Sequence, residues 1–256
     1  MKQLNFCTFG DKNNPPVFLI HGLFGSWENL KTLAKALSQT HFIIAVDCRN
    51  HGESFKEDTM NYQIMANDFE QLITHLNITK PSIVGHSMGG KIAMTIALRK
   101  KHPINKLIII DIAPKPYPPH HTSIIKELLA IDLTKFTHRS DVDMALAKQI
   151  PNQILRQFLL KNITKSSNGL VWKIHLKSIH NNYNKISKFL NEDIQWDGQC
   201  LFIRGKKSNY IEIHDELLIK QWFPNATIET IDASHWVHAE KPSETALVIN
   251  HFLNLK

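Results

Sequence analysis

Cysteine is scarce in this chain of 256 residues, which holds three, at Cys7, Cys48 and Cys200. Three separated cysteines in strand-like segments do not indicate a disulfide framework, and we interpret them as reduced core thiols of a cytoplasmic protein. The 15 histidines show no H-E-x-x-H spacing, and the cysteines show no C-x-x-C spacing. We therefore predict no metal site and no cofactor.

Long apolar runs are also missing. The apolar run 107–110 is interrupted by Asp111 and does not approach the length of a membrane span. The first residues lack the continuous apolar stretch of a signal peptide. We therefore expect no stable membrane insertion. With 43% hydrophobic residues, the chain is long enough to bury one large core, or a core with a small insertion.

Positive charge is concentrated in one segment. The formal net charge of the chain is +7, and residues 114–196 hold twelve Lys and Arg against six Asp and Glu. Such concentration favours an anionic partner. A general lysine-rich composition explains the same count, and both interpretations stay open. We expect a small-molecule partner and no nucleic acid.

Apolar runs of strand length alternate with helical patterns along most of the chain. Helical spacing of leucines and other apolar residues occurs at 27–37 and 61–76, and Asn61 is the predicted cap of the second helix. This alternation predicts a mostly parallel twisted sheet with helices on both faces, whose strands read as apolar runs because both faces are buried. The runs lie at 17–21, 42–47, 82–86, 106–112, 200–204 and 227–231.

The alternation breaks once, between residues 114 and 196. This segment opens with four closely spaced prolines and then reads as helices at 124–130, 142–149, 154–160 and 178–190, with a short extended piece at 170–176. We predict that residues 1–113 and 197–256 form one core and that 114–196 is a helical cap. The cap is expected over the carboxyl ends of the strands, where ligands bind in open α/β sheets.

A G-x-S-x-G pattern lies at 85–89, between a strand pattern and a helix pattern. This is the sequence of a nucleophile elbow, a sharp turn that holds Ser87 above the sheet edge. An earlier strand pattern ends in His21-Gly22, the place from which one oxyanion-hole amide comes in folds with this turn. We expect the N–H groups of Leu23, with Phe24 as the alternative, and of Met88 to stabilise a developing oxyanion.

The base is expected late in the chain. His235 follows the strand pattern at 227–231 directly and precedes a terminal helix pattern at 244–253. We favour His235 over His238, because the position immediately after the strand reaches the centre of the sheet. Trp236, together with Phe24 beside the predicted oxyanion loop, is predicted to line the substrate pocket.

The acid is expected in an unusual place. The loop after the strand that ends at Gly205, where the acid normally lies, holds no carboxylate before Glu212. Asp111 instead ends the apolar run that follows the elbow helix. A charge in so apolar a run requires a partner, and a histidine N–H is a suitable one. Asp111 is therefore the predicted acid, and we interpret Asp47 as a structural partner of Arg49.

Over the whole chain, these stretches resemble the α/β-hydrolase superfamily, and specifically the small bacterial YbfF-type esterases. The matching stretches lie at 21–26, 46–54, 85–91, 111–114 and 235–242. The resemblance implies a triad of Ser87, Asp111 and His235, and an auxiliary serine that maps onto Ser208. It also implies esterase and thioesterase activity on acyl substrates, including acyl-CoA. The chain departs from the pattern at Ser234, where glycine is common, and at Asn209, where proline is common.

Two functions compete with acyl hydrolysis. A C–C bond lyase or hydrolase uses the same triad, but such enzymes usually need an anion-binding arginine over the site, and the candidates are Arg139 and Arg156. The third interpretation is a non-catalytic binding module on a retained fold. Dehalogenase and epoxide hydrolase chemistry are excluded, because both need a carboxylate nucleophile where Ser87 stands.

Overall fold

Seven strands of this computed structural model form one twisted sheet within the described residues, 2–167, 169–189 and 194–255. The strand order is β1-β3-β2-β4-β5-β8-β9, and every neighbouring pair is parallel except β1 with β3. The sheet therefore has the mostly parallel arrangement that the alternating pattern predicts. The strands are β1 (Phe6–Phe9), β2 (Pro16–Ile20), β3 (Phe42–Val46), β4 (Ser82–His86), β5 (Lys106–Ile110), β8 (Gln199–Gly205) and β9 (Ala226–Ile231).

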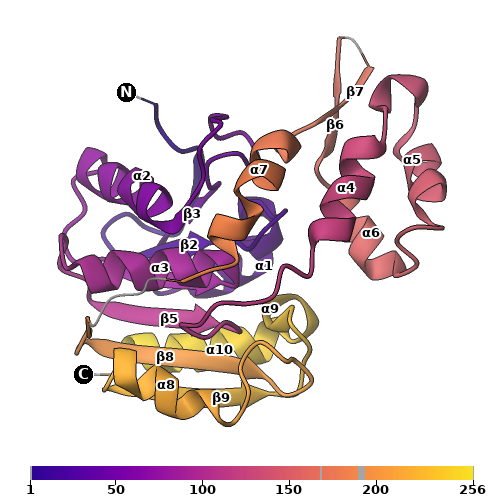
Figure 1. The fold of residues 1–256 in the computed structure, drawn as a ribbon. Helices are drawn as coiled ribbons and strands as arrows, with labels where there is room; N and C mark the ends of the chain where they lie inside the picture. The colour runs from indigo at the N-terminus through magenta and orange to yellow at the C-terminus, as the bar shows by residue number, and fades with distance from the viewer. Residues whose placement is uncertain (1, 168, 190–193, 256) are drawn as a thin grey trace.

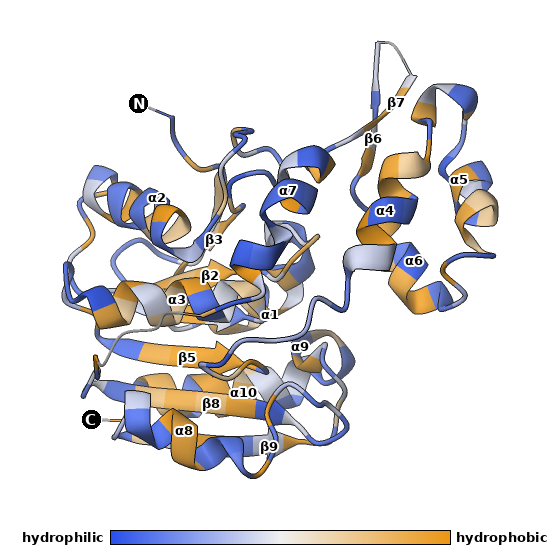
Figure 2. Ribbon diagram, viewed as in Figure 1, coloured by the Kyte–Doolittle hydropathy of each residue, from blue (hydrophilic) through white to orange (hydrophobic). Residues whose placement is uncertain are grey.

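Helices cover both faces of this sheet (Figure 1). One face of β2 packs Val17 and Leu19 into the core that α1 and α10 share, whereas Phe18 and Ile20 face the core of α2 and α3. Both faces of the central strands are thus buried, and β5 and β8 are hydrophobic along most of their length (Figure 2). The helices of the core are η1 (Trp27–Leu30), α1 (Lys31–Leu37), α2 (Tyr62–His75), α3 (Met88–Arg99), α8 (Asp215–Trp222), α9 (Val237–Glu240) and α10 (Pro242–Asn254).

The segment between β5 and β8 adds no strand to the seven-stranded sheet within the described part of the chain. Its helices α4, α5 and α6 stand over the carboxyl ends of the strands, and α7 returns toward the core (Figure 1). The elements are α4 (Thr122–Ala130), η2 (Leu133–Lys135), α5 (Arg139–Leu146), α6 (Gln153–Leu160), the antiparallel hairpin β6 (Ile163–Ser166) and β7 (Gly169–Trp172), and α7 (Leu176–Ile186). We call this segment the cap, and its division from the core at 114 and 196 stays a prediction.

Three local predictions differ from the structure. The edge strand β1 was missed, because its four residues are only half-buried and do not read as an apolar run. The extended piece expected at 170–176 is instead one strand of a hairpin, and α7 begins at Leu176. The helix expected at 178–190 ends at Ile186, and residue 190 lies outside the described residues. The predicted cap Asn61 is confirmed, since its side chain accepts the N–H of Ile64 at 2.9 Å.

Buried side-chain hydrogen bonds tie the cap to the core. Asn162 donates a hydrogen bond to the carbonyl oxygen of Phe24 at 2.8 Å, beside the predicted oxyanion loop. The Tyr62 hydroxyl donates to the carbonyl oxygen of Ile186 at 2.6 Å, at the end of α7. These contacts position the cap over the sheet. No helix among the described residues is long and apolar enough to cross a membrane.

Candidate active site

Ser87 occupies the sharp turn between β4 and α3. Its φ of 53° and ψ of −117° are unusual for a residue with a side chain, and the turn is held by a 3.0 Å hydrogen bond from its N–H to the carbonyl oxygen of Ile110. A Cβ on Gly89 would lie 2.3 Å from the carbonyl oxygen of Ile20. Glycine is therefore required there for helix and strand to approach, which leaves Ser87 half-buried at the tip of the turn.

His235 lies beside Ser87, in the loop between β9 and α9. Its Nε2 atom is 3.0 Å from the Ser87 hydroxyl, and its Nδ1 atom is 2.8 Å from Oδ2 of Asp111. The ring of Tyr210 stacks on the imidazole with 3.8 Å between centroids. An ionised carboxylate only accepts hydrogen bonds, so Nδ1 donates to Asp111 and Nε2 is left to accept the serine proton.

Asp111 is fully buried at the carboxyl end of β5. Its Oδ1 atom accepts the N–H of Gly205 at 2.8 Å, and its Oδ2 atom accepts from both His235 and the Ser208 hydroxyl. These hydrogen bonds offset the cost of burying the carboxylate. Ser208, the predicted auxiliary residue, thus donates its hydrogen bond to the acid.

The predicted oxyanion donors differ in their availability. The N–H of Phe24 donates to Nε2 of His51 at 3.2 Å, so this alternative donor is engaged. Burial lowers the pKa of His51 to about 3, which keeps the ring neutral and able to accept that bond. Among the described residues, the N–H groups of Leu23 and Met88 have no acceptor. These two donors are therefore available to an oxygen atom of a substrate.

Two further histidines, His86 and His238, pack next to His235. Nε2 of His86 is 2.9 Å from the carbonyl oxygen of His235, and the His86 and His238 rings lie 4.4 Å apart. Burial lowers the pKa of His86 well below its usual value and that of His238 to about 4. Within the described part of the chain, His238 makes no hydrogen bond to Ser87, which agrees with the preference for His235.

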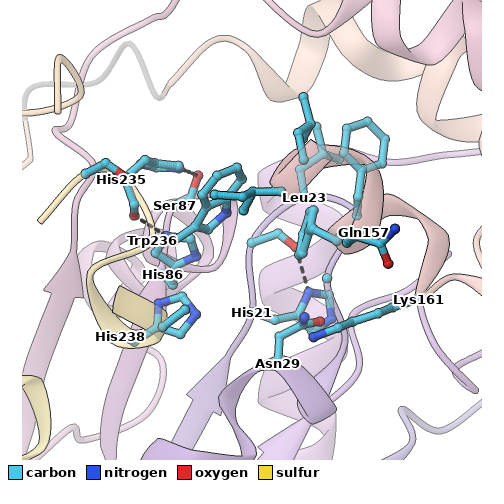
Figure 3. Close-up of a pocket in the computed structure, with 18 of the residues that line it drawn as sticks. His21, Leu23, Asn29, His86, Ser87, Gln157, Lys161, His235, Trp236 and His238 are labelled. Atoms are coloured by element: carbon cyan, nitrogen blue, oxygen red, sulfur yellow. Dashed lines mark hydrogen bonds between the residues drawn. The ribbon is translucent and has the colours of Figure 1, made fainter. Parts of the chain in front are cut away.

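A cavity of about 720 Å³ opens beside Ser87 and His235 (Figure 3). Its apolar wall includes Phe24 and Trp236, the two predicted pocket residues, together with Phe158 of α6, whose ring lies 5.8 Å from that of Trp236. At another end, polar side chains line the cavity, namely Asn29, Gln157 and Lys161. The cavity can therefore hold an apolar group of considerable size next to the reactive hydroxyl.

Asp47 and Arg49 have other partners in the structure than the sequence interpretation gave them. Asp47 does not pair with Arg49, because its carboxylate accepts the N–H groups of Trp27 and Glu53 at 2.8 and 3.0 Å. Arg49 instead makes a bidentate ion pair with Asp68 on α2, at 2.5 and 2.6 Å. Single-sequence spacing pointed to the nearest acid in the chain, whereas the fold turns the two side chains toward different elements.

The two arginines considered for an anion site are both engaged within the cap. Arg139 donates to the carbonyl oxygen of Ile163 at 2.6 Å, and Arg156 pairs with Asp143 at 2.7 Å. Neither arginine lines the cavity beside Ser87. The structure thus brings no cationic guanidinium from the described cap to the reactive hydroxyl.

Sequence reasoning missed the aromatic rings that hold the imidazole. Tyr210 lies in the loop after Gly205 that holds no carboxylate before Glu212, and His86 lies within the elbow pattern at 85–89. Their contacts with His235 come from chain segments far apart in sequence, and no spacing signal connects them.

For metals, one group of suitable side chains occurs among the described residues, at Glu212, His214 and Asp215. Lys115 already pairs with Asp215 at 2.7 Å, so one of the two carboxylates in this group is engaged.

The doubly covered parallel sheet and the serine elbow define an α/β hydrolase, and residues 15–138 match the model of the family described as alpha/beta hydrolase fold. The chain belongs to this family. It is 37% identical to Esterase YbfF of Escherichia coli (strain K12), over 94% of each chain. It is 36% identical to the sn-1-specific diacylglycerol lipase ABHD11 of Danio rerio, over 98% of this chain and 82% of that one.

A solved structure of a marine microorganism esterase superimposes with a TM-score of 0.95 and 36% identity, covering 98% of this chain and all of that one. The likeness thus extends over the cap as well as the core. Together with the esterase and lipase relatives, it makes the protein a carboxylic ester hydrolase.

Proposed function

We propose that the protein hydrolyses carboxylic esters through a triad of Ser87, His235 and Asp111 and an acyl-enzyme intermediate. The observation that carries the proposal is one continuous chain of hydrogen bonds. It runs from the Ser87 hydroxyl to Nε2 of His235 at 3.0 Å, and from Nδ1 to the buried Asp111 carboxylate at 2.8 Å. The nucleophile, base and orienting acid of covalent ester hydrolysis need this order of contacts.

Acylation follows from this geometry. Oγ of Ser87 attacks the ester carbonyl carbon while Nε2 of His235 removes the hydroxyl proton, and Asp111 stabilises the imidazolium. The negative oxygen of the tetrahedral intermediate accepts the free N–H groups of Leu23 and Met88, and each such donor contributes on the order of 10²–10³ in rate. His235 then protonates the leaving alkoxide. In the deacylation step, His235 activates a water molecule, which hydrolyses the acyl-enzyme and releases the carboxylic acid product from Ser87.

The test is hydrolysis of a short-chain p-nitrophenyl ester by the wild-type protein and by Ser87→Ala. The variant should lose roughly 10⁴–10⁶ of kcat, as removal of triad members does in other serine hydrolases. Its circular dichroism and melting temperature should match the wild type, because alanine only removes the hydroxyl. A kcat within tenfold of the wild type would contradict the assignment of the nucleophile.

Thioester hydrolysis of acyl-CoA is a second candidate, and the position of one lysine favours it. Of the twelve cationic side chains of the cap, Lys161 alone lines the large cavity, where it lies at the same end as Asn29 (Figure 3). Lys161 is exposed and has no ion-pair partner among the described residues, whereas Lys173 pairs with Glu53 at 3.1 Å. An exposed cation in the wall of this cavity is suited to attract a phosphate of the leaving group.

Lys161→Glu tests this candidate, with Lys165→Glu, at an exposed position of strand β6, as the matched control. In low salt, Lys161→Glu should lower kcat/KM for an acyl-CoA and leave kcat/KM for a neutral ester nearly unchanged. The control should change neither value. Raising the salt to about 0.15 M shortens the screening length to about 8 Å, so the difference between the two substrates should shrink. Equal salt curves for both substrates would exclude this role for Lys161.

A further inference from the structure

Ser87 lines a second, much smaller cavity of about 50 Å³. Leu23, Ser87 and His121 line both cavities and therefore stand between them. The walls that belong to the small cavity alone include Ile112, next to the acid, and Ile186, at the end of α7. An ester whose carbonyl carbon lies at Ser87 can thus extend its two arms into two cavities of very different size.

The proton path decides which arm enters which cavity. The leaving alkoxide takes its proton from Nε2 of His235, so the alcohol arm must lie where this histidine is accessible. His235 lines the large cavity and does not line the small one. Resting on the triad proposed above, we infer that the small cavity binds the acyl chain and limits it to short chains, while the large cavity takes the alcohol group.

The volume of the small cavity sets the limit. The small cavity has about 50 Å³, against about 720 Å³ for the large one, so it holds a chain of only a few non-hydrogen atoms. A butyryl chain fits within this limit and an octanoyl chain exceeds it. The alcohol arm meets no comparable limit, because the large cavity has about 720 Å³ and an apolar wall that includes Leu155 and Phe158.

Hydrogen bonds hold the walls of the small cavity in place. The Tyr62 hydroxyl donates to the carbonyl oxygen of Ile186 at 2.6 Å, and the Tyr183 hydroxyl accepts the N–H of His121 at 3.0 Å. The Tyr117 hydroxyl accepts the N–H of Ala113 at 2.8 Å. A longer acyl chain has to break such bonds to gain space, and breaking the buried bond of Tyr62 leaves a desolvated polar group.

The side chain of Lys91 adds a second barrier to a long alkyl chain. Lys91 is 2% exposed and lines the small cavity. Its ammonium donates to the carbonyl oxygen of Lys188 at 2.8 Å and lies 4.7 Å from the centre of the Tyr117 ring. Burial lowers the pKa of Lys91 to about 7, and an alkyl end that reaches this buried polar nitrogen offers it no hydrogen bond, which is unfavourable.

Two substrate series test the inference on the wild-type enzyme. In the first, the alcohol is p-nitrophenol and the acyl chain grows from acetyl to decanoyl. In the second, the acyl group is acetyl and the alcohol grows from ethanol to decanol. We expect kcat/KM to fall at least tenfold from butyryl to octanoyl in the first series, and to stay within about threefold or rise in the second. A higher kcat/KM for octanoyl than for butyryl would overturn the inference.

Two matched truncations locate the limit. Ile186→Ala enlarges the small cavity and should raise the octanoyl to butyryl ratio of kcat/KM at least fivefold. Ile154→Ala, the same truncation in the wall of the large cavity, should leave this ratio unchanged. The ratio within one preparation does not depend on the fraction of folded enzyme, so lower stability of Ile186→Ala does not affect it. An unchanged ratio in Ile186→Ala would contradict the inference, whereas absence of hydrolysis for every ester would contradict the proposed triad itself.

Discussion

Replacing Asp111 by asparagine should slow ester hydrolysis about 10⁴-fold and leave the fold intact. Asparagine suits this position, because Asp111 has a φ of 51° and asparagine tolerates the left-handed region. Its side-chain oxygen can still accept the N–H of Gly205, which lies 2.8 Å from Oδ1 of Asp111. The substitution therefore changes the charge and one acceptor while the volume stays the same.

The loss follows from the proton on His235. In the wild-type enzyme, Oδ2 of Asp111 accepts from Nδ1 at 2.8 Å, which leaves Nε2 free to take the proton of Ser87. In Asp111→Asn, an amide NH₂ group replaces this oxygen and can only donate a hydrogen bond. Nδ1 of His235 therefore has to be the unprotonated nitrogen that accepts this bond. Nε2 then carries the proton and no longer acts as a base. A 10⁴-fold loss corresponds to about 5 kcal/mol of transition-state stabilisation.

The assay is steady-state hydrolysis of p-nitrophenyl butyrate with an active-site titration. The decrease should appear in kcat, and the melting temperature should stay close to that of the wild type. Glu212→Gln is the control, since this carboxylate is exposed and makes no hydrogen bond to His235 among the described residues. A kcat of Asp111→Asn within tenfold of the wild type, or an equal loss in Glu212→Gln, would refute the reasoning.

Two further predictions concern residues around the triad. Ser208→Ala should lower kcat about tenfold, because it removes one donor to the Asp111 carboxylate without changing the charge there; an unchanged kcat would contradict this role. Burial lowers the pKa of His21 to about 4 and that of His51 to about 3, so below about pH 6.5 the unfolded chain binds protons that the folded protein does not. The free energy of unfolding should therefore decrease as the pH is lowered from 7 to 5. The expected decrease in urea titrations is about 1 kcal/mol per histidine and pH unit. His51→Gln, which can still accept the N–H of Phe24, should flatten this slope, and a pH-independent stability of the wild type would contradict the reasoning.

Much of the fold was predictable because buried parallel strands leave a strong local signal. The apolar runs around β2, β4 and β5 indicate strands that are buried on both faces. The glycines of the elbow indicate close approach of the backbone. Both properties can be recognised from residues that are neighbours in the sequence. The sequence also placed Ser87, Asp111 and His235 at strand ends that a parallel sheet brings to one edge, and the structure brings them within hydrogen-bond distance.

The remaining features depend on contacts between distant segments. The half-buried edge strand β1 has too few apolar positions to stand out, and the partner of Arg49 lies on α2 and not beside it in sequence. Stacking of Tyr210 on His235 and the small cavity beside Ser87 arise only when cap and core pack together. No periodicity within one segment records such packing.

The most direct test of the central claim is covalent labelling with a fluorophosphonate, followed by intact mass measurement and peptide mapping. The account predicts one adduct per chain, located on Ser87, formed much more slowly in Asp111→Asn and absent in Ser87→Ala. An adduct on a different serine would contradict the account, and so would ester hydrolysis that continues at the wild-type rate in a protein with Ser87 fully labelled.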